Sequence, residues 1–255
     1  MLDGKLTFIS GAASGIGRAA ALLFHSYGAR LVLADIDAEG LGRTAALVRE
    51  GGGEAAAFTL DVADYDAVDA VFEKIDREFG PLDAAFNNAG VEGAGGRMVP
   101  TQSYSRDAFD DVLRVNARGV FACMQAELRS FTASGQKGAI VNTASVMGLW
   151  GQPGMIGYCV SKHAVVGATR TAALEAAPAG VRVNAICPGA VATPMLTERG
   201  FVQNPEFAEA AAGVHPMKRI AEASEVAEAA AWLLSDKASF ITGCALPVDG
   251  GLSAG

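Results

Sequence analysis

Short runs of β-branched and aliphatic residues alternate with longer amphipathic segments along nearly the whole chain. The short runs are typical of buried strands, and the longer segments are typical of helices that cover a sheet. We expect strands at Leu6–Ser10, Arg30–Asp35, Ala55–Leu60, Leu82–Asn87, Ala139–Thr143, Val181–Ile186 and Cys244–Val248. We expect helices at Gly15–Tyr27, Ala38–Arg49, Asp64–Phe79, Ser105–Phe131, Tyr158–Ala176 and Ser224–Leu234.

This alternation predicts an α/β fold, a Rossmann-type doubly wound parallel sheet of about seven strands with helices on both faces. The chain has 255 residues and no linker, repeat or low-complexity segment, so we expect a single domain over residues 1–255. The stretch 190–216, which contains Pro194 and Pro205, is expected to be irregular. Long irregular stretches within compact domains are usually functional, and this one is predicted to be a substrate-binding lid.

Charge and composition argue against several classes of protein. The net charge of −8, without a cluster of lysine or arginine, argues against binding to nucleic acid or to an anionic membrane. No apolar run approaches the roughly 18 residues that a membrane span needs, and the first residues lack the layout of a signal peptide. We therefore expect a cytoplasmic protein. No metal site is expected, because the histidines do not cluster with the cysteines, which are Cys123, Cys159, Cys187 and Cys244.

A glycine-rich turn follows the first predicted strand. It reads Ser10-Gly11-Ala12-Ala13-Ser14-Gly15-Ile16-Gly17, a G-x-x-x-G-x-G pattern. Glycines allow a sharp turn and a close approach of the backbone to a pyrophosphate, which then faces the N-terminus of the following helix. The pattern predicts a dinucleotide-binding turn, with contacts from Gly11, Ser14, Gly15, Ile16 and Gly17.

Asp35 ends the second predicted strand, 18 residues after Gly17. A carboxylate there accepts hydrogen bonds from the adenosine ribose hydroxyls and repels a 2′-phosphate. Neither lysine nor arginine follows at once, since the next residue is Ile36, so NAD is predicted rather than NADP, with Asp35 and Ile36 beside the ribose. Asp61 and Val62 follow the third strand and are placed to meet the adenine ring, although Asp61 alone equally fits a helix N-cap.

Tyr158 and Lys162 stand four residues apart, a spacing that brings both to one face of a helix. A free tyrosine has a pKa of about 10, and a nearby cation lowers it by favouring the phenolate. Such a phenol can take the proton of an alcohol, or return it in the reverse direction. Ser145 follows the strand Ala139–Thr143, at the edge of the sheet where ligands bind, and can hydrogen-bond the substrate oxygen.

In this order, the motifs resemble those of the classical short-chain dehydrogenase/reductase family. The resemblance covers nearly the whole chain, with two small departures: Ser10 in place of the usual threonine, and Cys159-Val160 in place of a small pair. It is carried by the glycine turn, Asn87-Asn88-Ala89-Gly90, Asn116, Ser145, Tyr158, Lys162, Pro188-Gly189-Ala190-Val191-Ala192-Thr193, Ile241-Thr242-Gly243 and Val248-Asp249-Gly250-Gly251.

The resemblance implies specific roles. It implies a catalytic tetrad of Asn116, Ser145, Tyr158 and Lys162, in which Lys162 also binds the nicotinamide ribose and Asn116 holds a water. It also implies that the cofactor is lined or covered by Asn88, Ala89, Gly90, Tyr158, Pro188, Gly189, Val191 and Thr193. A homotetramer is implied as well, and the apolar residues Phe121, Met124 and Leu128 fit an interface, although they equally fit a helix face turned toward the sheet.

Together these features predict an NAD-dependent oxidoreductase that transfers a hydride between NAD and a small secondary alcohol or ketone. A polyol, a sugar and a cyclic alcohol all fit. Ser145, Met147, Trp150, Tyr158 and Met195 are the predicted substrate contacts, with Glu92 and Arg97 as polar candidates near the same edge. The apolar members of this set equally fit a core or a subunit contact. Two alternatives stay open: an NADP-preferring ketone or 3-oxoacyl reductase, and a non-catalytic dinucleotide-binding protein.

Overall fold

A computed structural model describes residues 1–197 and 205–254 of the chain. Its centre is a seven-stranded, fully parallel sheet with the strand order β3-β2-β1-β4-β5-β6-β9, which confirms the predicted fold class. The strands are β1 (Leu6–Ser10), β2 (Arg30–Asp35), β3 (Ala55–Thr59), β4 (Ala84–Asn87), β5 (Gly138–Thr143), β6 (Val181–Pro188) and β9 (Ala245–Val248).

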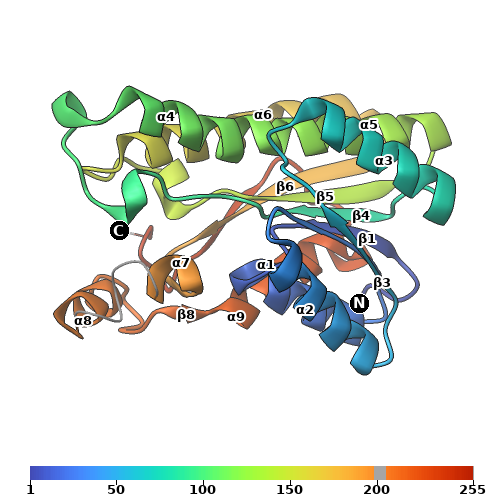
Figure 1. Cartoon of the computed structure of the whole chain (residues 1–255), viewed down its shortest axis with the longest axis horizontal. Coiled ribbons are helices and arrows are strands. Elements are labelled where there is room, and N and C mark those ends of the chain that lie inside the picture. Colours follow the sequence, from blue (N-terminus) through green and yellow to red (C-terminus); the bar gives the residue numbers. More distant parts are fainter. Residues whose placement is uncertain (198–204, 255) are drawn as a thin grey trace.

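Helices cover both faces of this sheet (Figure 1). One layer holds α1 (Gly15–Ser26), α2 (Ala38–Glu50) and α9 (Ala223–Leu234). The other holds α3 (Tyr65–Phe79), α4 (Arg106–Leu113), α5 (Val120–Ser134) and α6 (Ile156–Ala176). None of the helices in the described part combines the length and the apolar composition that a bilayer span requires.

The central strands are apolar on both sides because both faces of the sheet are covered. Successive residues of β1 contribute to opposite layers of the core. Phe8 packs against Phe72 of α3, with ring centroids 4.9 Å apart, whereas Ile9 belongs to the layer under α1 and α9. In that second layer, Phe24 and Phe86 lie with ring centroids 6.0 Å apart. This two-sided burial explains why the strands read as continuous apolar runs.

The predicted helix over Ser105–Phe131 is regular only in part. Its first section is α4 and its last section belongs to α5, but residues Arg114–Gly119 between them form a π-helical segment. A π segment has one more residue per hydrogen-bonded turn than an α-helix, which changes the direction in which its side chains point. Asn116 lies in this segment, so its orientation could not be read from an α-helical spacing.

The expectation of an irregular stretch at 190–216 is wrong for most of its described part. This stretch contains β7 (Val191–Ala192), α7 (Pro194–Leu196) and α8 (Pro205–Gly213), and β7 pairs in parallel with β8 (Ala221–Glu222). Pro194 is the first residue of α7, a position that tolerates the missing N–H group, and Pro205 is the first described residue of α8. Residues 198–204 of the predicted lid lie outside the described residues.

The three apolar residues of α5 that fit an interface do not share one environment. Met124 is buried in the core and Leu128 packs against it from a partly buried position, so these two side chains turn toward the sheet. Phe121 is exposed and lies edge-on to Tyr65, with ring centroids 6.4 Å apart. Of these three residues, Phe121 is therefore the one that is exposed enough to contact another chain.

A buried polar cluster ties the centre of the sheet to α5 and α6. The Asn87 amide donates to Glu127 Oε2 and to Asn142 Oδ1, each at 3.0 Å, and the Asn142 amide donates to Thr169 Oγ1 at 3.0 Å. All four side chains are essentially inaccessible to solvent. Burial raises the pKa of the Glu127 carboxyl to about 8, although the hydrogen bond from Asn87 acts in the opposite direction.

This raised pKa predicts a pH-dependent stability. The unfolded carboxyl ionises near pH 4.5 and the folded one near pH 8, so the folded state binds more protons between these values. Stability should therefore fall as the pH rises from 4.5 to 8, by at most about 1.4 kcal/mol per pH unit. Glu127→Gln removes this slope, because a glutamine does not titrate. Urea unfolding at pH 5, 6.5 and 8 measures it.

Glu175→Gln is the matched control, because Glu175 is exposed on α6 and its loss should leave the wild-type slope in place. Equal slopes for the wild type and Glu127→Gln would show that the buried carboxyl does not titrate in this window.

Candidate active site

A cavity of about 990 Å³ opens beyond the carboxyl ends of the central strands. The strand order reverses between β1 and β4, and open α/β sheets bind their ligands at such a reversal. Most predicted site residues line this cavity: Gly11, Ser14, Gly15, Ile16, Asp35, Ile36, Asp61, Val62, Asn88, Ala89, Gly90, Ser145, Met147, Trp150, Tyr158, Lys162, Pro188, Gly189, Val191, Thr193 and Met195. Gly17, Arg97 and Asn116 are not among the lining residues.

The glycine turn packs backbone against backbone. Gly11 has a φ of +68°, and a Cβ atom there would lie 2.8 Å from Cα and N of Ala89. Gly17 lies beneath the turn, where a Cβ atom would stand 2.0 Å from the Gly11 carbonyl oxygen. Any side chain at these positions would fill the space between the turn and the loop after β4. Gly17 therefore shapes the turn without lining the cavity.

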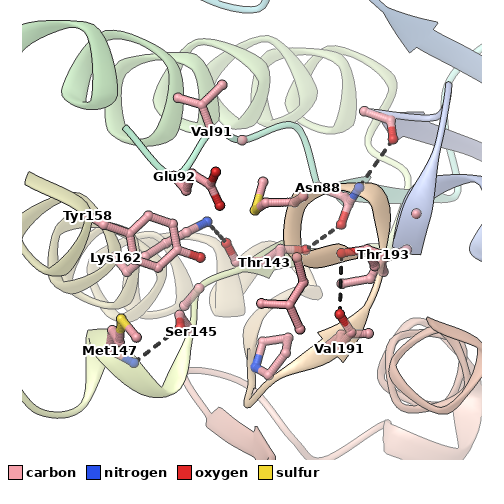
Figure 2. A pocket seen from close by; sticks show the side chains of 18 of the residues that line it. Asn88, Val91, Glu92, Thr143, Ser145, Met147, Tyr158, Lys162, Val191 and Thr193 are labelled. Atoms are coloured by element: carbon pink, nitrogen blue, oxygen red, sulfur yellow. Dashed lines mark hydrogen bonds between the residues drawn. The ribbon is translucent and has the colours of Figure 1, made fainter. Parts of the chain in front are cut away.

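Hydrogen bonds join the glycine turn to the loop that follows β4. The buried Ser10 hydroxyl accepts from the N–H groups of Asn88 at 3.1 Å and Ala89 at 3.2 Å. The Asn88 amide donates to the Gly11 carbonyl at 3.3 Å and accepts from Thr143 Oγ1 at 3.3 Å (Figure 2). The sequence did not reveal this role of Ser10. The contacts need only a hydroxyl oxygen, so they explain why serine can replace threonine here.

Asp35 lies at the end of the cavity predicted to take the adenosine. Its Oδ2 atom accepts from the Ala13 N–H at 2.8 Å, and its Oδ1 atom accepts from the Asp37 N–H at 2.9 Å. These backbone donors hold the carboxylate next to the glycine turn. A carboxylate has about four acceptor sites, so it keeps the capacity to accept further hydrogen bonds from ribose hydroxyls.

Asp61 lies nearby, and it does not cap a helix. That role belongs to Asp64, which accepts from the Ala67 N–H at the start of α3. Asp61 instead accepts from the Ala63 N–H at 3.0 Å and pairs with Arg114 at 2.9 Å. Burial favours the neutral carboxyl, but these two partners outweigh it and lower the pKa of Asp61. Arg114 also lines the cavity, and it could not be predicted from the sequence, because the π-helical segment brings it here.

Helix α6 brings Tyr158 and Lys162 to one face, as the spacing predicted. The Lys162 ammonium lies 5.5 Å from the centroid of the Tyr158 ring, and it donates to the Thr143 carbonyl at 2.8 Å. The Tyr158 hydroxyl and Ser145 lie at the same cavity wall, and Ser145 acts to lower the pKa of Tyr158. Ser145 Oγ in turn accepts from the Met147 N–H at 3.1 Å, which orients the serine at the start of a 3-10 turn (Figure 2).

Burial dominates the electrostatics of this group. It raises the pKa of Tyr158 to about 12, the Ser145 hydroxyl acts against it, and the charge of Glu92 adds to it. Burial also lowers the pKa of Lys162 to about 8. The expectation of a lowered tyrosine pKa is therefore wrong for the protein without a dinucleotide, because desolvation of the phenolate outweighs the nearby ammonium.

Asn116 stands behind the cavity wall. Its side chain accepts from the Val91 N–H and donates to the Val91 carbonyl, both at 2.7 Å, and also donates to Ser161 Oγ at 3.1 Å. The amide thus holds the two peptide groups on either side of the Val91 Cα, in the loop after β4. That it also takes part in holding a water stays a prediction.

His215 connects the predicted cofactor cover with α8. Its Nε2 atom accepts from the Ala190 N–H at 3.1 Å, so its Nδ1 atom carries the proton and donates to the Ala211 carbonyl at 2.7 Å. The ring is buried and lines the cavity, and a Cβ atom on Gly189 would lie 2.5 Å from Nε2. This role could not be predicted from the sequence, because the contact joins residues 25 positions apart.

His215→Ala is predicted to lose about 2 kcal/mol or more of unfolding free energy, because it leaves the Ala190 N–H and the Ala211 carbonyl without their partner. His163→Ala is the control, since His163 is exposed on α6 and its loss should cost less than about 0.5 kcal/mol. Urea unfolding of both variants measures the difference. A similar small loss for both would mean that the His215 contacts contribute little.

Within the described residues, no three histidine, cysteine, aspartate or glutamate side chains come together as a metal-ligand group. The arrangement instead combines a glycine turn, a carboxylate at the end of β2 and a phenol. This phenol lies beside an ammonium and a serine hydroxyl. Such a set can bind a dinucleotide and move a proton at a substrate oxygen.

Comparison with known proteins gives concordant results. A family model described as enoyl-(acyl carrier protein) reductase matches residues 11–253. The 2,5-dichloro-2,5-cyclohexadiene-1,4-diol dehydrogenase of Sphingobium indicum (strain DSM 16412 / CCM 7286 / MTCC 6364 / B90A) is 43% identical over 253 residues, which are 99% of this chain and 98% of that protein.

Two solved structures are also similar over nearly their full length. The crystal structure of levodione reductase has a TM-score of 0.94 and 39% identity, and the match covers 100% of this chain and 99% of that chain. The crystal structure of NAD⁺-bound xylitol dehydrogenase has a TM-score of 0.90 and 37% identity, with 98% and 99% covered.

Proposed function

Because the chain belongs to the short-chain dehydrogenase/reductase family, we propose that it is an NAD-dependent enzyme that interconverts a secondary alcohol and a ketone. The observation that carries the proposal is the group of Tyr158, Ser145 and Lys162 at the wall of one cavity with the glycine turn and Asp35. These residues would support proton transfer and dinucleotide binding in one site.

The residues present fit a dinucleotide. Side chains at Gly11 and Gly90 would meet Ala89 at 2.8 Å and the Asn116 amide oxygen at 3.2 Å, so these glycines keep the cavity wall open to a ligand. Asp35 would bind the adenosine ribose, and Lys162 would bind the nicotinamide ribose. When bound in its oxidised form, NAD supplies the hydride acceptor and a positive charge that favours the Tyr158 phenolate.

In alcohol oxidation, Ser145 holds the substrate oxygen by a hydrogen bond, and Tyr158 takes the hydroxyl proton. In ketone reduction, the protonated Tyr158 hydroxyl returns a proton to the same oxygen. Its raised pKa keeps it protonated before the reactants bind, which suits the acid role. The Lys162 ammonium, held by the Thr143 carbonyl, stabilises the Tyr158 phenolate, which takes the proton in alcohol oxidation and is left behind after proton donation in ketone reduction.

The substrate is proposed to be a small secondary alcohol with a compact carbon skeleton. The part of the cavity beside Tyr158 has largely apolar walls, contributed by Met98, Met147, Trp150, Met155 and Met195. Such walls favour an uncharged skeleton. The names of two similar proteins, a cyclohexadiene-diol dehydrogenase and a xylitol dehydrogenase, agree with a ring alcohol or a polyol.

Tyr158→Phe is expected to lower kcat by about 10²- to 10⁴-fold, because it removes the proton-transferring hydroxyl. NAD affinity should change by less than about threefold, since the ring stays in place. Absorbance of the reduced nicotinamide measures turnover, and calorimetry measures NAD binding. Tyr65→Phe, on the exposed surface of α3, should keep wild-type turnover. Retention of more than a tenth of the wild-type kcat by Tyr158→Phe would contradict the mechanism.

The wild type is expected to bind NAD at least about tenfold more tightly than NADP, because the Asp35 carboxylate repels a 2′-phosphate. Asp35→Ala should weaken NAD binding and strengthen NADP binding, whereas Asp66→Ala, on the first turn of α3, should leave both affinities unchanged. Titration calorimetry with each dinucleotide measures this. Tighter NADP binding by the wild type would favour the NADP-preferring reductase instead.

A broad panel of secondary alcohols and ketones distinguishes the proposed enzyme from the remaining alternative. Tight NAD binding without turnover of any member would indicate a non-catalytic dinucleotide-binding protein.

A further inference from the structure

We propose that Glu92 makes this site selective for alcohols that carry a second hydroxyl group. In this proposal, the second hydroxyl donates a hydrogen bond to the Glu92 carboxylate while the reacting hydroxyl contacts Ser145 and Tyr158. The inference rests on the proposed function, because it assumes that the reacting oxygen lies at Tyr158.

Glu92 shares one cavity with the catalytic group. It follows Gly90 by two residues, on the loop after β4, and lines the same cavity as Tyr158 and Ser145. Figure 2 shows its carboxylate directed into the cavity from the Val91 side, whereas Ser145 projects from the opposite side of Tyr158. Figure 2 shows the Glu92 carboxylate beside Tyr158, and the charge of Glu92 acts to raise the pKa of the Tyr158 hydroxyl.

The loop around Glu92 is held from both sides. On the N-terminal side, the Asn116 amide binds both the N–H and the carbonyl of Val91 at 2.7 Å. On the C-terminal side, Gly93 and Gly96 adopt left-handed conformations, with φ values of +74° and +73°. A Cβ atom on Gly96 would lie 2.5 Å from Glu92 Oε1, so the chain folds closely over this carboxylate. These contacts on both sides hold Glu92 in place on the loop.

Glu92 lies apart from the acidic residues at the end of the cavity that is proposed to bind the adenosine. Among the described lining residues, Asp35 and Asp61 belong to the adenosine end, and Glu92 is the acidic side chain beside Tyr158. The walls around it are largely apolar. A carboxylate in such a wall distinguishes substrates sharply, because it accepts a hydrogen bond from a hydroxyl, gains nothing from a methylene and repels an anion.

The Glu92 carboxylate can accept a hydrogen bond from a substrate hydroxyl even when it also has partners within the protein. Glu92 Oε1 is buried beneath Gly96, so the proposal places the substrate hydroxyl on Oε2. A carboxylate oxygen accepts about two hydrogen bonds, so a substrate hydroxyl can add to a partner that the protein provides. A hydrogen bond to a charged group is about twice as strong as one between neutral groups. A compound with one hydroxyl forms the contact with Ser145 and Tyr158 alone, whereas a diol of suitable spacing forms both contacts.

The test compares kcat/KM for cyclohexanol with kcat/KM for the cis and trans isomers of cyclohexane-1,2-, 1,3- and 1,4-diol. The wild type should prefer at least one diol by tenfold or more. Glu92→Met should remove this preference, mainly through a higher KM for the diol, when each enzyme is measured on the plateau of its own pH profile. Glu92→Gln should give an intermediate preference, because an amide oxygen still accepts a neutral hydrogen bond.

Two further measurements separate a specific role from a structural one. Glu92→Gln should shift the pH profile of kcat to lower pH, because the charge that opposes ionisation of Tyr158 is removed. Arg97→Met is the matched control: Arg97 is exposed on the same loop and is absent from the cavity lining, so the diol preference should be unchanged.

Equal kcat/KM values for cyclohexanol and every diol in the wild type, or an unchanged preference in Glu92→Met, would overturn the inference. Cyclohexanol turnover that depends on Tyr158 would at the same time leave the proposed function standing. Absence of turnover with all of these compounds would overturn this inference, whereas the proposed function falls only if the broad panel of alcohols and ketones also gives no turnover.

Discussion

The close contact between the glycine turn and the loop after β4 is the constraint on which the rest of the site depends. Gly11 and Gly17 leave no space for a side chain, since a Cβ atom on either would stand within 2.8 Å of backbone. Ser10 and Asn88 then bind the two segments together through the hydroxyl and the amide. Because this contact lies where the strand order reverses, the two loops form one wall of a single cavity.

Burial is the second determinant, and it acts on three ionisable groups near the centre of the molecule. It raises the pKa of the Tyr158 phenol, lowers that of the Lys162 ammonium and raises that of the Glu127 carboxyl. The same low polarity makes each remaining interaction stronger, so the Ser145 hydroxyl and the charge of Glu92 both influence Tyr158. A site of this kind is sensitive to a single added charge, such as that of a bound dinucleotide.

Much of the fold could be predicted from local patterns. The strands β1 and β2 match their predicted bounds, because an apolar run that is buried on both faces has a strong signal. Tyr158 and Lys162 share a face because helical spacing is a local property. The prediction was wrong near Pro194 and Pro205, which belong to helices instead of preventing them, and it did not identify the π-helical segment around Asn116. Where a helix begins and where it takes up an extra residue in a turn both depend on packing against neighbouring elements.

The sequence by itself determined the order of the elements, the glycine turn, the carboxylate at the end of β2 and the pairing of phenol with ammonium, because each is set by spacing within a few residues. Only the tertiary structure decided which distant groups meet. It brought His215 to the Ala190 N–H, Arg114 to Asp61 and Glu92 to the side of Tyr158. It also decided the ionisation of Tyr158, because desolvation depends on everything packed around a group and not on its neighbours in the chain.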